Sequence, residues 1–307
     1  MTDIPADGVG TQYREVVLRT YRYLRLGMAV LVALLGAAVV LEIISSNVQL
    51  DSISAYYYSP AHAVFVASLC AVGACLIVYR GQSDLEDAIL NGCGFLAFVV
   101  AFIPTRASEA RPCDPNSQFC TVAPATVEAN MWALLVTAAI SLALAFGVSV
   151  WKRKRSTSRP LPAGARAAYF VLLAGFIALA IFFIGWRSTF LSIGHYTAAI
   201  ALFVGIVMVV GLNGYRLGVE GSRVSGVRSH FLNRYALGFY IMVVSTVAII
   251  AAGRSGSLPH WIFYLESSLI AQFAMFWIVQ TVELWNEPPP PIPPPSAIRQ
   301  KPLARTT

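Results

Sequence analysis

The chain has 307 residues, of which 57% are hydrophobic and 12% are charged, and its net charge at pH 7 is +7. This composition excludes an ordinary soluble domain and indicates an integral membrane protein whose first partner is the lipid bilayer. Nucleic-acid binding is not expected, because the basic residues stand at the ends of apolar runs, where anionic lipid headgroups account for them.

The polar connections between the apolar runs reach roughly twenty residues at most, which is too short for an independent soluble domain. The chain also contains no G-x-x-x-x-G-K-[ST] or G-x-G-x-x-G motif before a helix. Any chemistry must therefore come from side chains of the membrane bundle itself.

About eight apolar runs follow one another, and each is long enough to cross a bilayer core as a helix. We predict an all-α integral membrane bundle over residues 26–283. A basic N-terminal segment, 1–25, extends the first helix, and a proline-rich tail, 284–307, follows the last one. The predicted spans are about 26–46, 60–79, 87–105, 129–151, 167–186, 194–213, 236–253 and 261–282.

The basic residues divide unequally between the two sides of the membrane that these spans define. Of the 22 Lys and Arg residues, 18 fall on one side, and the other side has only Arg106, Arg111, Arg187 and Arg254. Cytoplasmic connections of membrane proteins carry an excess of Lys and Arg. The pattern therefore predicts a multi-pass protein of the plasma membrane with both termini in the cytoplasm.

Ionisable and polar residues gather near the outer ends of the predicted spans. His62 opens the second span, His195 opens the sixth, and Glu266 lies about one and a half turns into the eighth. Such groups are costly in lipid and usually face the bundle interior or a water-filled cavity. We predict an outward-facing ligand-binding pocket formed by Asp51, Ser54, Tyr57, His62, His195 and Glu266.

A simpler interpretation of the histidines stays open. Both stand in an S-x-x-H pattern, Ser59–His62 and Ser192–His195, at the start of a span. Serine is a preferred helix N-cap, and a histidine one turn later costs little at the membrane interface. The same repeated pattern is also consistent with two related halves of four helices each.

Two cysteines stand apart from the other three. Cys113 and Cys120 lie in the predicted outer loop between the third and fourth spans and flank a turn-prone Asp-Pro-Asn sequence. In an oxidising compartment this pair is expected to form a disulfide hairpin that stiffens the loop.

The tail contains seven prolines in eight residues, from Pro288 to Pro295. This composition is typical of an extended polyproline II segment. Such a segment either spaces the basic end of the chain from the membrane or docks a proline-reading partner.

The segment Ser52–Val66, which begins S-I-S-A-Y-Y-Y, resembles a group of bacterial multi-span membrane proteins of unknown function. Tyr79–Gly81, Phe102–Thr105, His195–Ala199 and Trp261–Glu266 also look like that group, which is distantly similar to the Frag1/DRAM/Sfk1-like membrane proteins. The resemblance implies a polytopic helical fold with the outer polar segments in use, and no particular reaction. The alkaline-ceramidase-like intramembrane hydrolases are a second comparison, but this chain lacks their paired histidines near the C-terminus.

Three functions remain open. The first is a binding or accessory protein that holds a lipid or small ligand in the outer pocket. The second is a proton-coupled transporter that uses Glu266, although the spans look almost wholly apolar below their outer third. The third is an intramembrane lipid hydrolase, because His62, His195 and Glu266 are suitable residue types for zinc, although they lie on three different spans. The sequence leaves the identity of any cofactor or metal unknown.

Overall fold

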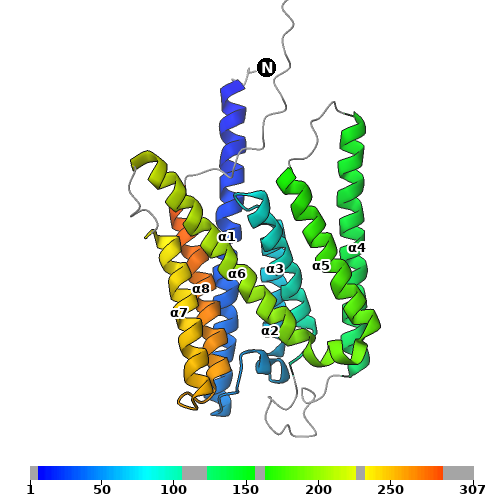
Figure 1. The fold of residues 1–307 in the computed structure, drawn as a ribbon, viewed down its shortest axis with the longest axis vertical. Helices are drawn as coiled ribbons and strands as arrows, with labels where there is room; N and C mark the ends of the chain where they lie inside the picture. Colours follow the sequence, from blue (N-terminus) through cyan, green and yellow to red (C-terminus); the bar gives the residue numbers. More distant parts are fainter. Residues whose placement is uncertain (1–5, 106–122, 156–162, 226–231, 286–307) are drawn as a thin grey trace, which may run out of the picture.

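The computed structural model describes residues 6–105, 123–155, 163–225 and 232–285, and within these ranges the chain is helical with no strand (Figure 1). The prediction of an all-helical fold is confirmed. The elements are α1 (Ala6–Ser46), the 3-10 helix η1 (Ser54–Tyr58), α2 (His62–Val78), α3 (Asp84–Phe102), α4 (Pro124–Arg155), α5 (Ala163–Gly185), α6 (Arg187–Ser225), α7 (Arg234–Arg254) and α8 (Trp261–Glu283).

Each predicted span falls on one of the eight α-helices, but several helices are longer than their spans. The helix α6 continues through polar residues to Ser225, about twelve residues beyond the predicted end. The apolar run predicts how much of a helix suits lipid, whereas the helix itself ends where its backbone hydrogen bonding ends. Likewise, α3 begins at Asp84 because the Ser83 hydroxyl caps it by accepting from the backbone N–H of Glu86.

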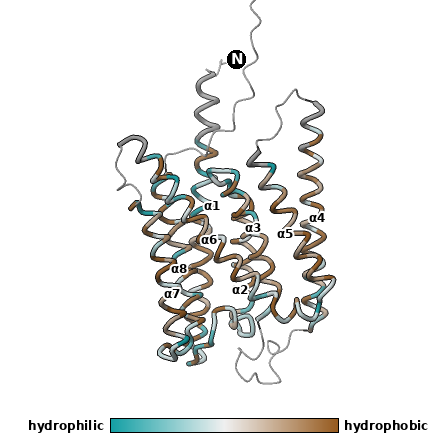
Figure 2. Tube along the Cα trace, viewed as in Figure 1, coloured by the Kyte–Doolittle hydropathy of each residue, from teal (hydrophilic) through white to brown (hydrophobic). Residues whose placement is uncertain are grey.

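Among the described residues, six helices are long and apolar enough to cross a membrane, namely α1, α3, α4, α6, α7 and α8. The helix α2 and the Tyr169–Gly185 part of α5 are shorter and also apolar. Figure 2 shows hydrophobic residues along the middle of the helices and hydrophilic residues mainly towards their ends. Large apolar side chains such as Leu41, Phe170 and Val282 are exposed on the outside of the bundle, as suits contact with lipid.

Successive helices run in opposite directions (Figure 1). The start of α1 and the α2–α3 connection lie at one end of the bundle. We call it the basic end, because Arg80 belongs to that connection and Arg22 and Arg25 donate to the carbonyl oxygens of Trp285 and Gln280 near the end of α8. The η1 segment and the α7–α8 turn lie at the opposite end, which we call the η1 end.

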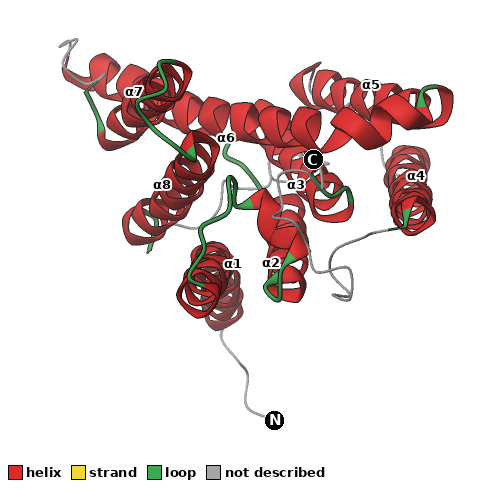
Figure 3. Ribbon diagram, turned by 90° about the horizontal axis from the view of Figure 1, so that it is seen from below, coloured by secondary structure: helices red, strands yellow, loops and turns green. Residues whose placement is uncertain are grey.

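Six of the helices form a closed ring. Going round it, α1 packs on α2, α2 on α3, α3 on α6, α6 on α7, α7 on α8, and α8 back on α1. The helices α4 and α5 lie outside this ring, where α5 contacts α3 and α6 (Figure 3). The ring brings together helices that are far apart in the sequence, such as α1 and α8.

The helices α2 and α3 approach each other to backbone contact. A Cβ atom on Gly94 would lie 2.5 Å from the carbonyl oxygen of Gly73, and one on Gly73 would lie 2.7 Å from the carbonyl oxygen of Gly94. Small residues at a crossing permit close packing of helices in lipid. This contact fixes the two helices that form one wall of the ring.

Candidate functional site

A cavity of about 80 Å³ lies inside the ring, and residues of α1, α2, α3, α6 and α8 line it together with Ile53 and Ser54. Most of the lining is aliphatic or aromatic, with Phe65 and Leu202 as examples. The polar residues among the lining are Ser54, Ser68 and Glu266. Apolar walls with a few well-placed polar groups are typical of small-molecule sites, but such sites usually hold about 300–1,000 Å³, so a lipid would enter this cavity only if the ring widens.

Glu266 lies at the η1 end of this cavity and holds η1 against α8. Its Oε2 accepts a hydrogen bond from the backbone N–H of Ser54 at 3.0 Å, and its Oε1 accepts one from the Ser54 hydroxyl at 3.1 Å. Ser54 itself is buried. Hydrogen bonds to a carboxylate are stronger than those between neutral groups, so this pair closes the η1 end of the cavity firmly.

Ser68 on α2 is the third polar residue of the cavity. The residue is 2% exposed, and its hydroxyl has no hydrogen-bond partner among the described residues. Leaving a buried hydroxyl without a partner costs about 1–3 kcal/mol. A polar group of a bound molecule, or a water, would therefore gain a bonding partner at this position in the cavity.

The two histidines contact the backbone at the η1 end. The Nδ1 atom of His62 lies 2.6 Å from the carbonyl oxygen of Tyr57, and the Nδ1 atom of His195 lies 2.6 Å from the carbonyl oxygen of Ile103. Because a carbonyl only accepts, Nδ1 carries the proton in both bonds. His62 thus tethers η1 to α2, and His195 tethers the end of α3 to α6.

Tyr57 and Asp51 complete the predicted set. Tyr57 is buried in η1 with its ring against that of His62, and burial raises the pKa of its phenol. Asp51 is exposed, and its Oδ1 lies 2.5 Å from the Nδ1 atom of His260 in the α7–α8 turn. Asp51 therefore connects two loops at the surface of the η1 end.

The structure thus distributes the six predicted residues over several contacts. It brings Ser54 to Glu266 and Tyr57 to His62, while Asp51 and His195 bind residues outside the predicted set. Within the described ranges, no three His, Cys, Asp or Glu side chains could hold a metal ion. Two further predictions, the Cys113–Cys120 disulfide and the Pro288–Pro295 segment, lie outside the described residues.

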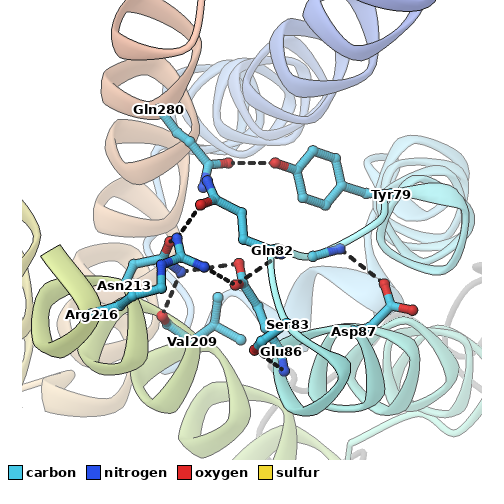
Figure 4. Close-up of polar contacts among 10 residues, drawn as sticks. Tyr79, Gln82, Ser83, Glu86, Asp87, Val209, Asn213, Arg216 and Gln280 are labelled. Atoms are coloured by element: carbon cyan, nitrogen blue, oxygen red, sulfur yellow. Dashed lines mark hydrogen bonds and ion pairs between the residues drawn. The ribbon is translucent and has the colours of Figure 1, made fainter. Parts of the chain in front are cut away.

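A buried polar network lies at the basic end, at the ends of the predicted spans and in the connections between them (Figure 4). Glu86 of α3 is 2% exposed. Its Oε1 accepts from the Asn213 amide at 3.0 Å, and its Oε2 accepts from the backbone N–H of Gln82 at 3.1 Å. Arg216 forms an ion pair with Glu86 at 3.7 Å and donates to the Gln82 side chain.

A second group of polar contacts at the same end joins α2, α8 and α1. The Tyr79 hydroxyl donates to the Gln280 side chain at 3.0 Å, and Arg25 donates to the Gln280 carbonyl oxygen at 2.9 Å. Arg25 and Gln280 are both buried. Figure 4 shows the side chains of Tyr79, Gln280, Gln82, Arg216 and Glu86 facing one another between the helices. We call these groups, with Arg25 and Asn213, the basic-end network.

A local signal for part of this network was present in the sequence. Ser83-Asp-Leu-Glu86 is an S-x-x-E pattern, which marks the first turn of a helix. It places Glu86 inside α3 rather than in the connection, and Asn213 interrupts an otherwise apolar run. Asn213 and Arg216, the partners of Glu86 on α6, had no such signal, because they belong to a distant helix.

Comparison of the chain with protein-family models, with curated proteins and with solved structures found no match.

Proposed function

We propose that this chain is an integral membrane protein that binds a lipid or another small amphiphile in the cavity of its helix ring. The observation that carries the proposal is the cavity itself, with apolar walls from five helices and the Glu266 carboxylate at one end. An acyl or ring-shaped apolar part suits the walls, and a polar head suits Glu266 and Ser54. The Ser68 hydroxyl supplies a further polar contact for the ligand.

The proposal includes the position of the protein in the plasma membrane. We place the basic end in the cytoplasm and the η1 end outside. The reason is that 18 of the 22 Lys and Arg residues belong to the segments that the sequence pattern assigns to the same side as the N-terminus and the α2–α3 connection. In this orientation the Glu266 end of the cavity faces outwards. The relation to the bacterial multi-span group, and a proline-reading partner at Pro288–Pro295, stay part of the same proposal.

The test is to fill the cavity and measure the lipid that stays bound. Ala199 of α6 lines the cavity, whereas its neighbour Ile200 is 65% exposed on the outside. We expect Ala199→Phe to remove most of a photoactivatable lipid that cross-links to the wild-type protein in nanodiscs, because the added ring occupies the site. Ile200→Phe is the matched control and should cross-link like the wild type. Equal labelling of both variants, with both folded, would overturn the proposal.

Proton-coupled transport is the second candidate, and the basic-end network is the observation that favours it. Among the cavity residues, Leu76 of α2 lies one turn before Tyr79 of the network, and Leu31 of α1 lies less than two turns after Arg25. Polar contacts therefore close the ring at both ends of an apolar cavity, an arrangement suited to alternating access. If the protein is a proton-coupled transporter, Glu266→Gln should abolish pH-driven uptake of a fluorescent amphiphile into proteoliposomes. Glu128→Gln, which lies outside the ring, is the control and should retain the uptake.

The lipid-hydrolase alternative receives the least support. Its serine would need a histidine as a base, whereas the Ser54 hydroxyl donates to Glu266. His62 and His195 hold backbone carbonyls through Nδ1. Zinc chemistry needs convergent ligands, and the described side chains do not gather three of them.

A further inference from the structure

A second hollow, of about 410 Å³, lies on the outside of the ring at the η1 end, between α1 and the start of α2. Its lining is mostly apolar and includes Leu41 and Ile44, which are 65% and 70% exposed. We call this hollow the α1–α2 groove. In the proposed orientation it faces the outer leaflet of the membrane.

The residues that line the α1–α2 groove and those that line the ring cavity are neighbours along both α1 and α2. On α1, Ala38 lines the groove, and Leu35, one turn away, lines the cavity. On α2, Phe65 lines the cavity, and Ala61, one turn before it, lines the groove. Leu35, Ala61 and Phe65 belong to one small apolar cluster, against which Ala38 packs. This cluster therefore contributes residues to the lining of both hollows.

The charge of both hollows has the same sign. Glu42 lines the groove and Glu266 lines the cavity, and neither lining contains Lys, Arg or His. Within the described part of the chain, no Lys, Arg or His forms an ion pair with Glu42. Carboxylates at both positions attract a cationic group with N–H donors and repel a phosphate or carboxylate.

We propose that the ligand is an amphiphile with an ammonium head group, and that it reaches the ring cavity sideways from the outer leaflet through the α1–α2 groove. Glu42 receives the head group at the groove, and Glu266 holds it in the cavity. This inference rests on the proposed function, because it uses the same cavity.

The head group is tested with a photoactivatable long-chain alkylamine and a fatty acid of the same chain length, in nanodiscs of phosphatidylcholine. We expect the alkylamine to cross-link to the wild-type protein and the fatty acid to do so much less. Equal cross-linking of the two would overturn the head-group assignment. If Ala199→Phe still blocked both, the cavity itself would stand, whereas labelling unaffected by Ala199→Phe would remove the proposed function.

The route is tested by the rate of alkylamine cross-linking. Glu42→Gln should slow association roughly threefold to tenfold, because a charge at the rim of a site acts mainly on the association rate. Ser45 lines the groove, and its exposed neighbour Ser46 does not. Ser45→Lys should slow association as Glu42→Gln does, and Ser46→Lys should not. Both positions are exposed, so folding should be retained. Unchanged rates in Glu42→Gln and Ser45→Lys would overturn the route.

Discussion

Ser54 and Glu266 are 212 positions apart in the chain, yet they are joined by two hydrogen bonds at 3.0 and 3.1 Å. The contact attaches the short helix η1 to α8 and closes one end of the ring cavity. It also places a carboxylate where an apolar pocket has few other polar groups. The same two residues therefore contribute to stability and to the proposed site.

The Ser54–Glu266 pair should be measurable in a double-mutant cycle. We expect Ser54→Ala and Glu266→Gln each to lower the free energy of unfolding, with a coupling of about 1.5–3 kcal/mol, the range for hydrogen bonds to a charged group. Unfolding in detergent measures this, and the exposed Ser255→Ala should be neutral. Fully additive effects would show that the bond between the Ser54 hydroxyl and Glu266 adds no stability, since Ser54→Ala keeps the backbone N–H bond.

The glycine contact between α2 and α3 predicts a sharp difference between two substitutions. Gly94→Ala should destabilise the protein by about 1–3 kcal/mol, because its Cβ would lie 2.5 Å from the Gly73 carbonyl oxygen and the helices must move apart. Gly36→Ala in α1 meets nothing within 4 Å and should be neutral or slightly stabilising. Thermal unfolding of the two variants and the wild type measures this difference. Equal melting temperatures for Gly94→Ala and Gly36→Ala would contradict the prediction.

The buried acid of the basic-end network should matter more than an exposed one. We expect Glu86→Leu to cost about 1–3 kcal/mol, because the buried Asn213 amide loses an acceptor, whereas the Arg216 side chain is 31% exposed and can turn to water. The exposed Glu15–Arg19 pair is the control, since Glu15→Leu should cost less than about 1 kcal/mol. Denaturant unfolding of both variants in detergent tests this, and similar losses would count against the network.

The orientation of the protein in the membrane can be measured with single cysteines. Ser255 in the α7–α8 turn and Leu232, just before α7, are both exposed and lie at opposite ends of α7. A membrane-impermeant maleimide added to intact cells should label Ser255→Cys and leave Leu232→Cys at the background of the wild-type chain. The reverse pattern would place the basic end outside and remove the outward-facing pocket.

The sequence predicted the helices well because their signal is local. An apolar run of bilayer length must satisfy its own backbone hydrogen bonds, so each run becomes a helix whatever its neighbours are. The ends were less accurate where polar residues continue a helix, as they do up to Ser225 in α6. The division of the 22 basic residues also comes from the sequence alone, and it predicts which connections are cytoplasmic.

The candidate site was predicted only in part. The outer polar residues drew attention because charged and polar groups are rare in the spans, and Ser54 and Glu266 do meet. The function of His62 and His195 as tethers of backbone carbonyls has no signature in the sequence, because any nearby carbonyl could accept their proton. Glu86 and Asn213 were overlooked as a pair, since they are 127 positions apart.

The sequence by itself determined that this chain is an all-helical, strongly apolar protein with a basic side, because bilayer thickness, backbone hydrogen bonding and charge act on each segment separately. Only the tertiary structure decided that α3 lies beside α6 and α1 beside α8, which closes the ring and creates its cavity. Helix neighbours depend on how side chains fit together across a contact, and fit between distant segments is not encoded in the pattern of either one alone.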